Sequence, residues 1–197
     1  MSKWSQSAAL VYPDNDDQND QSLIEIPNLI KLKVQCRPDI QADLQVIENI
    51  LKVSIPISPQ QPTQPEGDNP IVFCTGLNEW LVVLHCANAK TLRSKLIEGL
   101  SLIYVITDLS DSLVAFELQG DKGHDILSEG CGVDLSEQAA VKGTYWLANL
   151  FNLSVIIHLV TNLKSQNFRV YLDRSNLEYF VQFTESLPCS YSHNVGS

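Results

Sequence analysis

The chain has 197 residues, enough to bury a core in one sizeable domain or in two small, closely packed ones. Its formal net charge is −10, and its 13 lysines and arginines are spread along the sequence, which argues against nucleic-acid binding. The sequence shows neither an apolar run of the roughly 18–20 residues that span a bilayer nor the features of a secretory signal, so we expect a cytoplasmic protein.

The first third of the chain predicts a tail, a strand, a helix and a loop. Residues 1–22 are polar and acidic and are expected to form a loose tail. Apolar and basic residues alternate over 30–34, the period of a half-exposed strand. A helix should begin at Pro38, because four apolar residues follow at helical spacing: Ile40, Leu44, Ile47 and Leu51. Residues 56–70 hold five of the nine prolines and predict a loop within a domain.

The middle of the chain predicts paired strands and another helix. Strands are expected over residues 71–74 and 80–85, joined across a turn at 76–78. Asn88 should cap the helix that follows, and Gly99 should end it.

Two further strands are expected over residues 102–107 and 114–118. In the second one the even-numbered side chains should face the core together. The residues between them, 108–111, predict a turn whose Asp and Ser side chains bond nearby backbone amides.

The last third predicts a helix, three strands and a final helix. Asp121 should cap a short helix that stops at Gly130. Strands are expected over residues 145–150, 155–160 and 168–172. In the last of these strands the even-numbered side chains should point inward, and the side chains expected to point to solvent are Arg169 and Tyr171.

The final helix is expected to open at a capping box of Ser175 and Glu178 and to close at Pro188. This order of elements predicts an α+β fold with a mostly antiparallel sheet and helices packed on one face. We expect a single domain over residues 23–188, followed by a short polar tail over residues 189–197.

The sequence contains no pattern typical of a catalytic or cofactor-binding site. The glycine-rich nucleotide and phosphate motifs and the nucleophile elbow are all missing. Five cysteines, none in a CxxC pair, are most simply reduced and buried. Cys131 lies between two glycines, but no basic residue lies near it in the sequence to activate its thiol. His158, on an apolar strand, fits a satisfied core histidine better than a metal ligand.

Two features admit more than one interpretation. Asp108 and Asp111 have the spacing of paired carboxylates for acid–base catalysis, but a turn uses the same spacing to satisfy its own amides, and contact with a partner protein is a third possibility. Trp80 could cover a ligand, although a large aromatic residue that opens a buried strand is usually a core anchor.

Four short motifs follow one another in a fixed order: Gly-Leu-Asn-Glu-Trp-Leu at 76–81, Asp-Leu-Ser-Asp at 108–111, Gly-Cys-Gly-Val-Asp-Leu at 130–135 and Phe-Arg-Val-Tyr-Leu-Asp-Arg-Ser at 168–175. Their order and spacing resemble the gamma subunit family of heterotetrameric sarcosine oxidase over residues 30–187. The family often continues the second motif with Gly-Arg, whereas this chain has Ser112 and Leu113.

The resemblance implies a fold like part of the folate-binding aminomethyltransferases and a non-catalytic, structural role in a multi-chain flavoenzyme. Enzymes of that family demethylate sarcosine to glycine and pass the one-carbon unit to tetrahydrofolate. The resemblance places FAD, FMN, NAD and tetrahydrofolate in the alpha and beta chains and zinc in the delta chain, with no cofactor or metal in the gamma chain.

The same resemblance implies that the alpha, beta and delta subunits are the partners, chiefly the alpha subunit. We expect the contact region at Trp80, Asp108, Ser110 and Asp111. No catalytic residue is assigned.

Two other classes stay open. Free-standing folate-binding proteins of the iron–sulfur-repair type carry a KGCxxGQE-like motif, and residues 129–132 resemble its start, whereas residues 133–135 do not continue it. Aminomethyltransferases proper are much longer and need further domains to close the folate pocket.

Overall fold

The computed structural model describes residues 23–36, 44–59, 70–84, 89–100, 104–135, 141–160 and 167–186. Several predicted features lie outside these residues, namely the tails at 1–22 and 189–197, the helix start at Pro38, the cap at Asn88, the helix end at Pro188 and most of the loop at 56–70.

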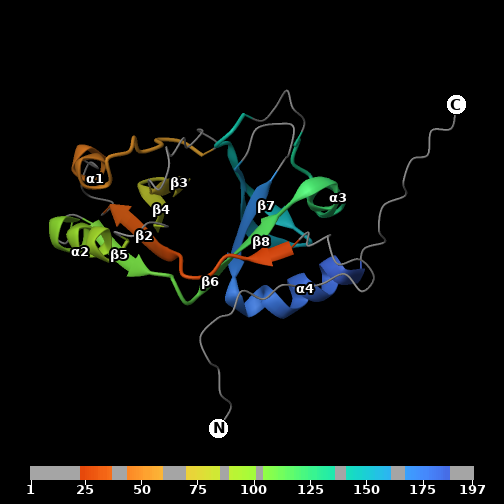
Figure 1. Ribbon diagram of the computed structural model, residues 1–197. Coiled ribbons are helices and arrows are strands. Elements are labelled where there is room, and N and C mark those ends of the chain that lie inside the picture. Colours follow the sequence, from red (N-terminus) through yellow and green to blue (C-terminus); the bar gives the residue numbers. More distant parts are fainter. Residues whose placement is uncertain are drawn as a thin grey trace, which may run out of the picture.

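Within the described residues, nine strands form two antiparallel sheets (Figure 1). The larger sheet has the order β1-β6-β9-β8-β7, with the bounds Leu23–Glu25, Leu113–Leu118, Phe168–Asp173, Leu153–Leu159 and Tyr145–Leu150. The smaller sheet has the order β3-β4-β2-β5, with the bounds Ile71–Gly76, Glu79–Leu84, Ile30–Cys36 and Tyr104–Asp108.

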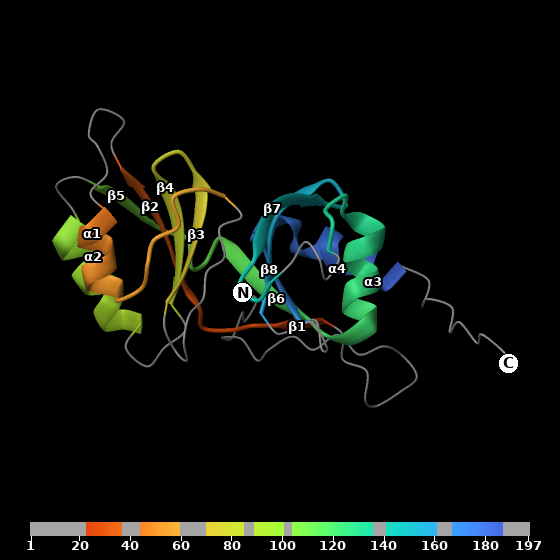
Figure 2. The same ribbon diagram turned by 90° about the horizontal axis from the view of Figure 1, so that it is seen from above.

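Four α-helices cover the outer faces of the two sheets. They are α1 (Leu44–Leu51), α2 (Ala89–Leu100), α3 (Gly120–Gly130) and α4 (Leu177–Ser186). Figure 2 shows the layers: α1 and α2 lie outside the smaller sheet, α3 and α4 lie outside the larger one, and the two sheets face each other between them. The predicted α+β, antiparallel class is confirmed, with two sheets where the sequence indicated one. None of the described helices is long and apolar enough to cross a membrane.

The inner faces of the two sheets meet in a core of their own around Phe73. Its ring lies 5.0 Å from that of Tyr145, 5.2 Å from that of His158 and 5.3 Å from that of Tyr171, all edge-on. The Tyr145 hydroxyl also accepts a hydrogen bond from the backbone N–H of Cys74 (2.8 Å) and donates one to its carbonyl (3.1 Å). Each sheet is therefore buried on both faces.

Burial on both faces explains why one predicted orientation is wrong. Tyr171 was expected at the surface because it alternates with the apolar residues of β9, yet it is only 2% exposed. The alternation correctly separates the two faces of the strand. It does not reveal that the second face is covered by another sheet.

Two predicted helix caps are also wrong. Asp121 lies inside α3, which begins at Gly120 and has Gln119 at the N-cap position without a side-chain hydrogen bond. The residue before α4 that acts as a cap is Asp173, whose carboxylate accepts hydrogen bonds from the N–H (2.8 Å) and the hydroxyl (2.6 Å) of Ser175. A 3-10 turn over Arg174–Asn176 then leads into α4 at Leu177. Asp173, two residues upstream, thus satisfies the Ser175 amide that the Glu178 side chain would satisfy in a capping box.

Candidate partner-binding site

The turn after β5 is built as its residue types predict. Asp108 ends the strand, and its Oδ1 accepts hydrogen bonds from the backbone N–H (3.0 Å) and the hydroxyl (2.6 Å) of Ser110. The side chains of Asp108 and Asp111 are both exposed. The turn therefore offers two carboxylates to solvent on a fixed backbone.

This turn also joins the two sheets. The Ser110 hydroxyl accepts a hydrogen bond from the backbone N–H of Lys31 on β2 (3.1 Å), and Leu109 donates its N–H to the Lys31 carbonyl (2.7 Å). On the other side, Nε of Arg174 donates to the backbone carbonyl of Asp111 (2.7 Å). The turn is thus held from β2 of one sheet and from the end of β9 in the other.

An ion pair fixes the outer edge of the turn. Nε of Arg93 on α2 lies 2.8 Å from Oδ2 of Asp108. Partial burial raises the pKa of the Asp108 carboxyl, but hydrogen bonds from Ser110 and Arg93 and the charge of Arg93 outweigh it, so the pKa is lowered. Asp108 is thereby kept ionised and already paired, which suits binding or positioning rather than general acid–base catalysis.

Lys31 is a charged residue beside this turn that was not among the predicted site residues. The alternating basic residues of β2 predicted a half-exposed strand, yet Lys31 is 4% exposed. Burial lowers the pKa of its ammonium and Arg174 lowers it further, while Asp111, Glu25 and Asp108 oppose the shift. The alternation of lysines with apolar residues along β2 is typical of a strand with one face in solvent, so the sequence gives no sign that a second sheet will cover Lys31.

Trp80 lies apart from the turn, on the helix-facing side of the smaller sheet. It is 3% exposed, and its indole Nε1 donates a hydrogen bond to the Pro56 carbonyl (2.8 Å). This environment fits the core-anchor interpretation of Trp80. The structure therefore brings together Asp108, Ser110 and Asp111 but not Trp80.

Two buried polar side chains between the sheets lack hydrogen-bond partners. Both ring nitrogens of His158 and the hydroxyl of Tyr171 are unpaired among the described residues. Burial lowers the pKa of His158 to about 3, with a contribution from Arg169. Burial raises the pKa of Tyr171 to about 12, and Arg169 offsets part of this shift. The predicted core position of His158 is correct, but the histidine is not satisfied.

Cysteine and metal chemistry gain no support in the described part of the chain. No group of three or more His, Cys, Asp and Glu side chains there could hold a metal ion. Cys131 is the C-cap residue of α3, donates its N–H to the Leu127 carbonyl (2.9 Å) and forms an isolated bridge with Leu150. These contacts give Cys131 a structural role.

Comparison with solved structures shows which proteins share this fold. A chain of the heterotetrameric sarcosine oxidase from Corynebacterium sp. U-96, solved with pyrrole 2-carboxylate, superimposes with a TM-score of 0.71 at 19% sequence identity, covering 83% of this chain and 80% of that one. The chain has the fold of a sarcosine oxidase subunit. Because the two covered shares are nearly equal, the two chains are of similar length.

The glycine cleavage system aminomethyltransferase T from Bartonella henselae has the same fold over part of its length. The TM-score is 0.57 at 11% identity, and the match covers 83% of this chain but only 45% of the aminomethyltransferase. No model of a protein family and no curated protein matches the sequence. The likeness to the sarcosine oxidase chain and to the aminomethyltransferase fold, expected from the four motifs, is thus confirmed at the level of structure.

Proposed function

We propose that this chain is a non-catalytic assembly subunit of a heterotetrameric, flavin-dependent sarcosine oxidase, equivalent to the gamma subunit. The observation that carries the proposal is the match over about four-fifths of both chains to a single chain of such an enzyme. The alpha, beta and delta subunits would be its partners, and they would hold the flavins, NAD, tetrahydrofolate and zinc. The same proposal makes the protein cytoplasmic.

The turn at 108–111 is the contact region that we favour. Its carboxylates are exposed, its backbone is fixed from both sheets, and its acidity suits a basic surface on a partner. The double variant Asp108→Ala with Asp111→Ala should weaken assembly while leaving a folded chain, because the Asp108–Arg93 ion pair is exposed and the bonds from Lys31 and Arg174 to the turn involve neither carboxylate. Glu129→Ala on the exposed side of α3 is the control. Normal assembly of the double variant would refute the assignment.

The proposal as a whole is tested by affinity capture of the tagged chain from its native host. The captured material is analysed by mass spectrometry and by flavin absorbance. Recovery of a large flavin-containing oxidase is the expected result. Recovery of the chain alone and without colour would contradict the proposal.

The likeness to an aminomethyltransferase favours a second candidate, a free-standing folate-binding protein of the iron–sulfur-repair type. Titration of the purified chain with tetrahydrofolate separates the two candidates. Saturable micromolar binding together with the absence of an oxidase partner would support this candidate over the assembly subunit.

A further inference from the structure

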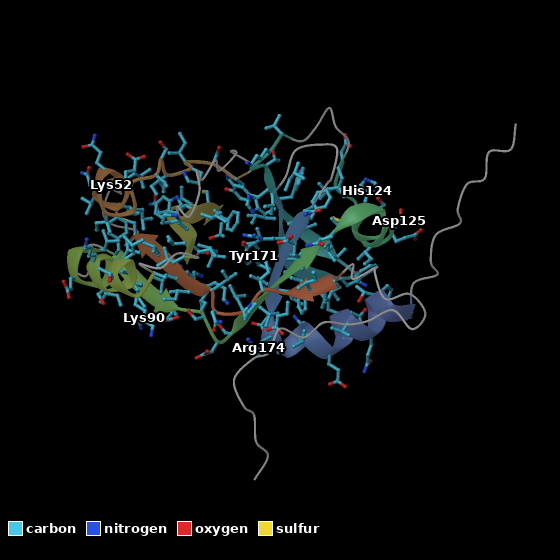
Figure 3. All side chains as sticks on the ribbon, in the orientation of Figure 1. Lys52, Lys90, His124, Asp125, Tyr171 and Arg174 are labelled. Atoms are coloured by element: carbon cyan, nitrogen blue, oxygen red, sulfur yellow. The ribbon has the colours of Figure 1, made fainter. Side chains whose placement is uncertain are left out.

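An open cavity of about 450 Å³ is lined by residues of both sheets. Its floor is the inner face of the larger sheet, where the strand register places Leu147 beside Ile156 and Ile156 beside Tyr171. Thr75, near the end of β3, lines the cavity from the smaller sheet. Figure 3 shows Tyr171 between the two halves of the molecule. The volume falls in the range of small-molecule sites, which is about 300–1,000 Å³.

Strands, not loops, hold the polar side chains that line this cavity. Asn149 and Ser154 are register partners on β7 and β8, and Asp173 ends β9. The Thr75 hydroxyl donates a hydrogen bond to Oε1 of Glu79 (2.9 Å), which fixes the threonine side chain. Sites that are built on strands of a packed sheet keep a defined geometry before a ligand arrives.

The lining is apolar with a single charge. Leu113, Leu147 and Ile156 supply apolar surface, and Asp173 is the only charged residue among those that line the cavity. Leu147 is 41% exposed, so part of this apolar surface is open to solvent in the free chain. The combination of apolar walls with one carboxylate favours a ligand that has an apolar body and one cationic group.

The carboxylate of Asp173 is able to bind such a cation. Its Oδ1 accepts the two hydrogen bonds from Ser175, and these bonds lower the pKa of the carboxyl, which is therefore ionised at neutral pH. A carboxylate has acceptor sites on both oxygens, so Oδ2 still has lone pairs for a ligand. The bonds to Ser175 also hold the carboxylate in one orientation.

We propose that this cavity binds a small organic ammonium compound, whose charged nitrogen pairs with Asp173 and whose apolar body rests on Leu147 and Ile156. An anion is repelled by Asp173. An amino acid brings a carboxylate of its own, and the lining contains no lysine or arginine to pair with it. The site therefore fits simple amines and not amino acids. This inference goes beyond the proposed assembly role and does not depend on it.

The test is a titration of the purified full-length chain with phenethylamine, followed through the amide NMR signals of Leu147, Ile156 and Asp173. Saturable shifts of these signals are the expected result. Hydrocinnamate, which carries a carboxylate on a similar apolar body, should cause none.

Two variants with matched controls test the two parts of the site. Asp173→Asn keeps an oxygen that caps Ser175 but loses the charge, so the chain should stay folded and bind phenethylamine about tenfold more weakly. Glu178→Gln removes an exposed charge from α4 and should leave binding unchanged.

Leu147→Asn removes apolar surface from the wall and should weaken binding about fivefold. Its control is Ile97→Asn on α2, because Ile97 is 39% exposed and does not line the cavity. The amide spectrum of each variant shows whether the chain is folded.

Three results would overturn the inference: no saturable shift with phenethylamine, equal affinity of Asp173→Asn and the wild type, or displacement of the amine by the captured oxidase partners. Displacement would place the cavity in a subunit interface. Assembly is measured separately, by capture from the native host. A chain that binds the amine but captures no oxidase would therefore refute the assembly role alone.

Discussion

Replacing the unpaired histidine between the sheets should change how stability depends on pH. His158 faces Phe73, with Tyr145 opposite it on β7 and Arg169 opposite it on β9. It is 2% exposed, and burial with a contribution from Arg169 lowers the pKa of its imidazole from 6.5 to about 3. On the next strand, β6, the acidic group is Glu117, whose Oε2 lies 3.3 Å from Nε of Arg169. The folded protein therefore keeps His158 neutral at a pH where the unfolded chain binds a proton.

The sign and size follow from proton linkage. Between pH 6.5 and about 3 the unfolded state carries the extra proton, so the free energy of unfolding falls as the pH falls through this window. From pH 7 to pH 5 the loss that His158 causes is about 2 kcal/mol. His158→Leu, of similar volume and without a titrating group, should abolish this loss. At pH 7 it should be neutral or stabilising by about 1 kcal/mol, because it removes two unpaired buried nitrogens.

The assay is urea unfolding followed by circular dichroism at pH 5, 6 and 7, for the wild type and for His158→Leu. The control is His124→Gln on α3, where the ring bonds Ser128 and is not enclosed between the sheets (Figure 3). The control should show the same fall in stability from pH 7 to pH 5 as the wild type. An equal fall in His158→Leu would refute the reasoning, since the loss would then come from other groups.

Two further substitutions test the packing. Gly130→Ala at the end of α3 should destabilise the protein by about 1–3 kcal/mol, because the added Cβ would overlap the ring of Phe151. Helix propensity alone would favour Ala by about 1 kcal/mol, so the sign tests the packing. Thermal unfolding measures the effect, and the control Gly132→Ala, whose Cβ meets nothing within 4 Å, should be nearly neutral. Trp80→Phe should lower the free energy of unfolding, measured in urea, by about 2–4 kcal/mol, because it leaves the Pro56 carbonyl without its donor and opens a gap in the core. A loss below about 0.5 kcal/mol would show that this hydrogen bond and the packing of the indole contribute little.

The strands were predictable because their apolar periods are strong. The spans expected at 145–150 and 168–172 agree with β7 and β9 to within a residue, and the turn expected at 76–78 includes the two residues, 77 and 78, that join β3 to β4. Asn78 takes φ 56° there, a conformation that Asn tolerates well, which is why the residue types predicted this turn correctly. The turn at 108–111 was likewise predictable, since its hydrogen bonds are local.

The errors about burial share one physical cause, which is the second sheet. Tyr171 and Lys31 lie on inner faces, and each is more buried than expected because residues distant in the sequence cover it. The apolar periodicity of a strand indicates which residues share a face of the sheet, but it does not indicate which element packs against that face. A sign was nevertheless present in β8, where Val155–Leu159 is apolar at four of five positions without alternation, the pattern of a strand buried on both faces.

The same arrangement explains where a partner would bind. Within the described residues both outer sheet faces carry helices and the inner faces pack on each other around Phe73, whereas the two carboxylates of the turn after β5 are exposed. This turn is hydrogen-bonded to Lys31 on β2 and to Arg174, the residue that follows β9. Because the turn is tied to both sheets, a basic partner that binds it would also fix the two sheets relative to each other. Assembly should therefore raise the melting temperature of the wild-type chain more than that of the double variant Asp108→Ala with Asp111→Ala.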